Sequence, residues 1–210
     1  NVSSGANFSS MFSSATAFNQ NIGGWNMVSA VNLSVMFFGA TSFNQNIGSW
    51  VVSGVTGLGA MFRDATSFNQ DISGWNTSNV TSLRETFRGA STFAQDLSSW
   101  DVSGVTDFEG VFRSSQSDFD YSTWQLHSAT SLRRAWLGVP LSAANISACL
   151  IAWEADASTA TGVDAFEAFG GTSMSETTYA TAKTAYDNLV LAVGSGGKGW
   201  DLTGAINWTP

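Results

Sequence analysis

The stretch Met-Phe-Arg-Asp-Ala-Thr-Ser-Phe-Asn-Gln-Asp-Ile-Ser-Gly-Trp at residues 61–75 decides the fold, because its order of aromatic, amide and apolar residues recurs along the chain. The spacing of the recurrence is 25 residues over most of its length. Its clearest columns are Trp25, Trp50, Trp75 and Trp100, followed by Trp124; Phe18, Phe43, Phe68 and Phe93, followed by Phe119; and Leu33, Leu58, Leu83, Phe108 and Leu132. Such regular spacing identifies a repeat protein.

The pattern inside one repeat predicts the fold class. Residues 97–102 alternate between apolar and polar side chains around Trp100, which is typical of a short strand. The apolar side chains of residues 105–112 recur at spacings of three and four, which indicates one or two turns of helix. We therefore expect an α/β solenoid, a right-handed, leucine-rich-repeat-like stack of about six 25-residue coils with a parallel sheet, plus an α+β C-terminal cap.

The repeat fades after residue 136, which predicts two domains: a leucine-rich-repeat-like solenoid at residues 1–136 and a C-terminal capping domain at residues 137–210. In the second domain, Ser142 can cap a helix with an apolar stripe, and Ser173 and Glu176 have the spacing of a capping box for another. Because the chain starts in mid-coil, we expect further repeats before Asn1 or another molecule over that end.

The repeat resembles that of the BspA-like leucine-rich-repeat surface proteins, most closely in the stretch at residues 61–75. The resemblance covers about residues 1–136, and the tail is more loosely similar to the segment that often follows such repeats. It departs from the family pattern at Ala94, where Asn is usual, and at Phe119-Asp120-Tyr121, where the Phe-Asn-Gln signature is lost. The resemblance implies secretion to a cell surface and a role in adhesion, aggregation or surface architecture, and it does not imply catalysis.

The amino-acid composition excludes several classes of binding partner. Charged residues make up 11% of the chain, and the net charge of -8 opposes binding to nucleic acid and to anionic lipid headgroups. No apolar stretch is long enough to span a bilayer, so we expect no membrane insertion. Cys149 is the only cysteine, which excludes an internal disulfide and favours a small buried side chain over an intermolecular link.

We expect no enzyme, no metal site and no cofactor. No Ser-His-Asp arrangement can be assembled around His127, the only histidine, and Glu85 and Glu109 are isolated carboxylates. The column Asn21, Asn46, Asp71 and Asp96 lacks the dense ligand loop that calcium requires.

Two further polar columns leave alternatives open. The Asn19, Asn44, Asn69 column and the neighbouring glutamines are interpreted as amides that satisfy backbone groups, with a ligand-binding ladder as the alternative. The Thr16, Thr41, Thr66 column is interpreted as a turn, with ice or polysaccharide binding as the alternative.

Asn-x-Ser/Thr sequons favour a secreted glycoprotein if the source is a eukaryote. They are Asn1, Asn7, Asn32, Asn76, Asn79, Asn145 and Asn207. The sugar is expected chiefly at Asn7, Asn32 and Asn207, which lie near ends or turns.

The functional hypothesis is an extracellular or cell-surface protein with a structural or adhesive role. It would act through contacts with other proteins or further copies of itself, as part of a larger assembly or filament. A glycan-binding module is the alternative, and an ice-binding solenoid a further one. The candidate contact file consists of the outward residues after each Trp: Asn26, Val51, Asn76, Asp101 and Gln125.

Overall fold

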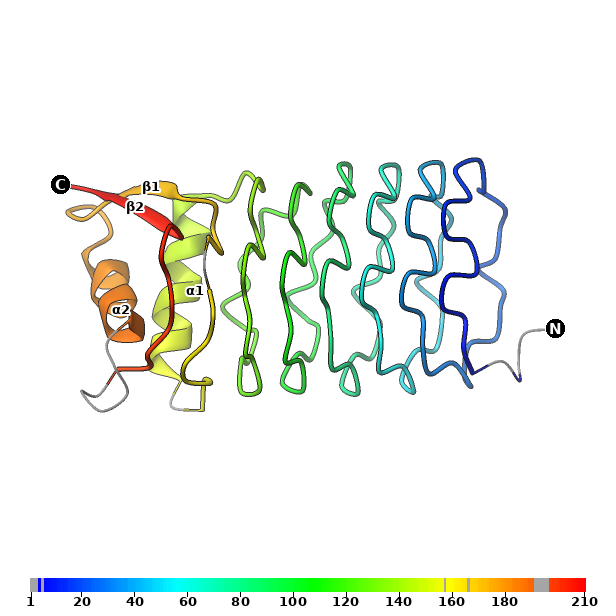
Figure 1. Ribbon diagram of the computed structural model, residues 1–210, viewed down its shortest axis with the longest axis horizontal. Coiled ribbons are helices and arrows are strands. Elements are labelled where there is room, and N and C mark those ends of the chain that lie inside the picture. The colour runs from blue at the N-terminus through cyan, green and yellow to red at the C-terminus, as the bar shows by residue number, and fades with distance from the viewer. Residues whose placement is uncertain (1–3, 5, 157, 166, 191–196) are drawn as a thin grey trace.

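The computed structural model describes residues 4, 6–156, 158–165, 167–190 and 197–210. Its regular elements are helix α1 (Ala143–Ala155), strand β1 (Thr172–Ser175), helix α2 (Ala180–Val190) and strand β2 (Ile206–Thr209). Strands β1 and β2 pair in parallel, with Thr172 opposite Ile206 and Ser175 opposite Thr209. Figure 1 shows these elements gathered at the C-terminal end of an elongated molecule.

The predicted α/β solenoid of coils with a parallel sheet is wrong. Over the described residues, every helix and strand lies after residue 142, and the parallel sheet there has two short strands. The expected strand at residues 97–102 and the expected helix at residues 105–112 are instead turns joined by irregular backbone, with an isolated bridge at Asp107. Among the described residues, regular helix and strand, which were predicted along the whole chain, are therefore confined to the C-terminal region.

Hydrogen bonding explains why the repeats contain turns in place of helix. In the second repeat, the N–H groups of Phe37 and Gly39 donate to the carbonyls of Met61 and Arg63, at 2.9 and 2.8 Å. The N–H between them, that of Phe38, instead closes a turn on the carbonyl of Val35 at 3.2 Å. A helix needs every N–H to donate four residues back along its own segment. Because alternate N–H groups point to the next repeat, a helix cannot form.

Left-handed backbone recurs at two positions in each repeat. Val35 and Gly39 have φ angles of 62° and 64°, and corresponding residues elsewhere repeat this conformation. One series is Ser10, Val35, Ala60, Glu85, Gly110 and Arg134; the other is Ser14, Gly39, Asp64, Gly89, Ser114 and Gly138. Such residues interrupt a right-handed helix, and a β-branched residue such as Val35 is strained there by about 1–2 kcal/mol.

Consecutive segments meet edge to edge through single parallel bridges. Figure 1 shows the turn-built segments lying side by side from the N-terminal end toward α1. The bridges join Asn7 with Asn32, Asn32 with Gly57, Gly57 with Ser82, Ser82 with Asp107, Asp107 with Ser131, Ser131 with Asp164, and Asp164 with Asp201. One bridge per segment does not make a strand. The last bridge shows that the tail near Trp200 pairs with an earlier segment.

The core consists of aromatic columns that follow the 25-residue spacing. The Trp50 and Trp75 ring centroids are 6.4 Å apart with an interplanar angle of 3°, and Trp75 and Trp100 are 6.3 Å apart. These three indoles are only 3–4% exposed, so this part of the Trp column lies inside the protein. Trp25 is partly buried.

Each buried indole also makes a hydrogen bond to the preceding repeat. The Nε1 groups of Trp50 and Trp75 donate to the carbonyls of Ile22 and Ile47, both at 3.2 Å, and Trp100 does the same to Ile72 at 3.1 Å. A buried polar group costs free energy unless it is paired. The Trp column therefore fills the core and gives each buried indole N–H a partner, at a carbonyl that also accepts a turn hydrogen bond.

The C-terminal helices agree with the sequence in part. Ser142 caps α1, accepting from the Asn145 N–H at 3.3 Å, and α1 buries the predicted stripe together with Cys149. Burial raises the pKa of the Cys149 thiol to about 12, so it remains protonated near neutral pH. The capping box is wrong, because Ser173 lies in β1 and α2 begins only at Ala180.

Substituting Trp75 by Ala should lower the free energy of unfolding by about 3–5 kcal/mol, because it leaves a cavity and removes a partner from the Ile47 carbonyl. Chemical denaturation followed by circular dichroism measures the loss. The matched control is Gln125→Ala at an exposed position, which should change the free energy by less than about 0.5 kcal/mol. Equal effects from both substitutions would show that the Trp column does not hold the repeats together.

Val35→Gly should raise the free energy of unfolding by up to about 1 kcal/mol, because relief of the left-handed strain exceeds the added chain entropy of the unfolded state. The reverse change at the corresponding position, Gly110→Val, should lower it by a similar amount. A Cβ atom at Gly110 would make only ordinary contacts, the nearest 3.5 Å from Glu85, so crowding does not confuse the comparison. Thermal denaturation of both variants tests the pair, and shifts of the same sign would contradict it.

Candidate binding surface

The five residues of the contact file are exposed, as the sequence indicated. Each follows a Trp of the core column, so burial of the ring turns the next side chain outward. They are Asn26, Val51, Asn76, Asp101 and Gln125. The core thus sets a row of outward side chains, one for each repeat.

Local hydrogen bonds hold the backbone along this file. The Oδ1 atoms of Asn26, Asn76 and Asp101 accept from the N–H group two residues further on, at 3.0–3.1 Å. The Ser103 side chain and N–H together lower the pKa of the Asp101 carboxyl. Such turns preorganise the loops, and they keep Asp101 ionised above its lowered pKa.

The surface is hollowed by open grooves that cross several repeats. The larger, of about 770 Å³, is lined by Asn21, Gly23, Gly24, Asn46, Gly48, Ser49, Asp71, Ser73 and Gly74. A second, of about 400 Å³, contains the file residues Asp101 and Gln125 beside Ser98 and Thr123. Both are open; the first is lined by small polar side chains and glycines, and the second also by Trp100 and Val102. Their shape suits an extended partner better than a small molecule that must be enclosed.

The amide column satisfies backbone groups, and the interpretation made from sequence is confirmed. Asn44 Oδ1 accepts from the Asn69 N–H at 3.0 Å and from Gln70 Nε2 at 2.9 Å. Asn19 Oδ1 serves the next repeat in the same way. Because these oxygens are occupied by the neighbouring repeat, the column acts first as a link between repeats.

The Asn21, Asn46, Asp71, Asp96 column forms turns. Each Oδ1 accepts from the N–H two residues on, at 2.9–3.0 Å. Among the described residues, no group of three or more His, Cys, Asp or Glu side chains is placed to hold a metal ion.

The threonine column likewise faces the neighbouring repeat. Thr41 Oγ1 donates to the Thr16 carbonyl at 3.2 Å, and Thr66 Oγ1 donates to the Thr41 carbonyl at 3.4 Å. A second threonine row, at Thr56, Thr81, Thr106 and Thr130, makes the same type of bond. The hydroxyl protons are therefore used within the protein, which weakens the idea of an array that binds ice.

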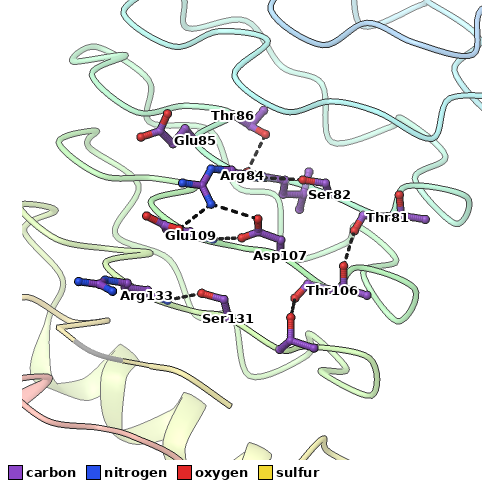
Figure 2. A network of polar contacts seen from close by, with 12 residues as sticks. Thr81, Ser82, Arg84, Glu85, Thr86, Thr106, Asp107, Glu109, Ser131 and Arg133 are labelled. Atoms are coloured by element: carbon purple, nitrogen blue, oxygen red, sulfur yellow. Dashed lines mark hydrogen bonds and ion pairs between the residues drawn. The ribbon is translucent and has the colours of Figure 1, made fainter. Parts of the chain in front are cut away.

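Charged side chains form a network between repeats that the sequence analysis missed. Figure 2 shows Arg84 reaching Asp107 and Glu109 of the next repeat, and the Arg84 to Glu109 contact is 2.6 Å. Burial alone would lower the pKa of Arg84, but these two carboxylates raise it above its ordinary value. Glu85, interpreted from sequence as an isolated carboxylate, pairs with both Arg63 and Arg88. The signal was available, because Arg84 and Glu109 stand in one column with opposite charges.

His127, Ser158 and Asp156 come together, contrary to the expectation that no such group could be assembled. Ser158 Oγ is 2.6 Å from His127 Nε2, and Asp156 Oδ2 is 3.4 Å from the same nitrogen. In a catalytic triad the serine hydroxyl bonds to one ring nitrogen of the histidine and the carboxylate to the other. Here Asp156 lies near the same nitrogen as Ser158, and the Ser158 hydroxyl donates to the Asp156 carboxylate. The cluster therefore ties the loop of His127 to the end of α1 without the geometry of an activated nucleophile.

The sequons differ in how accessible they are. Asn7, Asn76, Asn79 and Asn207 are exposed, Asn32 and Asn145 are half-buried, and Asn1 lies outside the described residues. The nitrogen that would carry a sugar already donates at three of them. Asn79 Nδ2 donates to Ser53, Asn145 Nδ2 to Asp118 and Asn207 Nδ2 to Gly171.

In the part of the chain that the structure describes, neither helix has the length and apolar character needed to cross a membrane.

The repeats place the chain in a known family. A family model described as "Mycoplasma protein of unknown function, DUF285" matches residues 1–67 and 46–148, which together span residues 1–148 of 210. Comparisons with curated proteins and with solved structures gave no match. Because the matched region covers more than half of the chain, the chain belongs to the DUF285 family.

Proposed function

We propose that the protein is a non-enzymatic, extracellular or cell-surface component with a structural or adhesive role. It acts through protein–protein contacts made along its repeats, within a larger assembly or filament. The observation that carries the proposal is the exposed contact file, whose five residues stand at the same place in consecutive repeats.

The chemistry of the file favours many weak contacts over one strong site. Strong protein–protein contacts usually depend on Trp, Tyr and Arg anchors in the centre of an interface. Here Trp50, Trp75 and Tyr121 are in the core, and Arg63 and Arg84 are engaged in ion pairs. Affinity must then come from several copies acting together, as multivalent display provides.

The narrower resemblance to BspA-like leucine-rich-repeat surface proteins supports the same proposal. It implies secretion and surface adhesion, and the division into a repeat region at 1–136 and a capping region at 137–210 forms part of it. The description of the DUF285 family assigns no function, so the argument depends on the resemblance and on the exposed file.

A glycan-binding role is the second candidate, favoured by the groove of amide, hydroxyl and glycine residues around Asn46. Sugar sites commonly combine such polar groups with an exposed aromatic ring, and Trp50 and Trp75 beside this groove are buried. Protein contacts therefore fit the surface better.

Beads that display many copies should be retained on a surface coated with serum proteins, while the free chain at the same total concentration is retained weakly. Protease treatment of the coat should abolish retention, and Asn76→Ala or Gln125→Ala should change it by less than about twofold. Bead retention and surface plasmon resonance measure the two forms.

Three outcomes would contradict this proposal. Retention on dextran, chitin or mucin that free sugar releases would favour the glycan-binding role. Loss of all retention through one substitution would reveal a discrete site, and a hydrolytic turnover would show that the protein is an enzyme.

A further inference from the structure

We infer that Val28, Val31 and Val51 form a self-association surface, here called the valine surface, on which a second copy of the chain docks. The inference rests on the proposed function and names the partner for one part of the exposed surface.

The three valines are the exposed apolar residues of the loops that follow Trp25 and Trp50. Their exposed fractions are 56% at Val28, 45% at Val31 and 51% at Val51. The loops are adjacent, because the Thr56 N–H donates to the Val31 carbonyl at 2.9 Å. Gly54 of the second loop also faces the Ala30 carbonyl of the first. The two loops that carry the valines therefore lie side by side.

Other repeats show what the fold itself uses at these positions. Val28 corresponds to Ser78 and Ser103, whose hydroxyls donate to Asn76 and Asp101 at 2.8 and 2.7 Å. The fold gains a hydrogen bond from serine there and gains none from valine.

The same holds for the other two positions. Val31 corresponds to Thr56, Thr81 and Thr106, whose hydroxyls donate to the preceding repeat. Val51 corresponds to Asn26, Asn76 and Asp101, whose Oδ1 atoms close turns. At all three positions valine gives up a stabilising hydrogen bond and exposes apolar surface to water. Folding does not account for that choice, and contact with a partner does.

Charge distribution identifies the partner as a second copy. The net charge is -8, yet no charged residue or histidine precedes Arg63. Two copies that meet through the loops at residues 26–31 and 51–56 keep their acidic regions apart. A charged partner would find no complementary group there, whereas a second copy brings the same apolar side chains to a self-complementary contact.

The valine surface is small, which fits assembly by many copies. A stable pair usually buries about 800 Å² on each partner, and three half-exposed valines supply only a part of that area. The contact between two free copies is therefore weak, and it becomes strong when many copies are held together.

The test measures self-association of the full chain by sedimentation velocity and by clumping of beads coated with it. The first variant, Val28→Ser/Val31→Thr/Val51→Asn, restores the residues that other repeats use. It should weaken self-association about tenfold or more without lowering the melting temperature. Val190→Ser removes an exposed valine of α2 and is the matched control, which should change association by less than about twofold.

A charge variant makes the test sharper. Val51→Asp places there the residue found at the corresponding Asp101, so the fold tolerates it, and it should weaken clumping about tenfold or more. Gln125→Asp adds the same charge to the file, three repeats away, and should have a much smaller effect. Added salt should not weaken association of the unaltered chain, because no ion pair contributes to the valine surface.

The outcomes separate this inference from the proposed function. Clumping that persists in the triple variant, or that Met11→Thr abolishes at the exposed Met11, would show that copies meet elsewhere. An unaltered chain that never self-associates but is retained on the protein coat would overturn this inference alone. Coated beads that bind neither one another nor the protein coat would overturn both.

Discussion

The structure depends on hydrogen bonds that run between backbone groups one repeat apart. Alternate N–H groups, such as those of Leu33, Val35 and Phe37, donate to carbonyls of the following repeat at 2.9–3.0 Å. This pairing places equivalent residues of consecutive repeats side by side, so side chains of the same type contact each other from one repeat to the next. Parallel Trp and Phe rings, the amide column and the threonine rows are consequences of that register.

The sequence predicts which side chains are buried better than it predicts the backbone conformation. Periodic Trp residues in a polar chain indicate burial, and Trp50, Trp75 and Trp100 are buried. The spacings of two, three and four that suggested strand and helix are equally compatible with successive turns. The deciding feature, left-handed backbone at Val35, Ala60 and Glu85, has no common residue type and so leaves no sequence signal.

The candidate surface was predictable to a similar degree. Exposure of the file follows from its position after each Trp, so Asn26 and Gln125 could be placed outward from sequence. The approach of Ser158 to His127 could not be predicted, because the two residues are 31 positions apart and Ser158 lies beyond the repeats, after α1. The pairing of Arg84 with Glu109 was predictable in part. The two residues occupy the same position in consecutive repeats, so the repeat register places them side by side.

Repetition also separates what the fold requires from what it merely tolerates. Many polar side chains of the repeats bond to neighbouring repeats or to their own turns, as Asn44, Thr66 and Asp71 do. A residue that departs from its column and loses such a bond must be explained by something outside the fold. Charged departures, such as Arg84 and Glu109, find their partners within the protein. Apolar departures at Val28, Val31 and Val51 remain exposed to solvent, in the part of the chain that carries no charge. The specificity of a repeat protein with so uniform a surface then depends on the few positions at which its repeats differ.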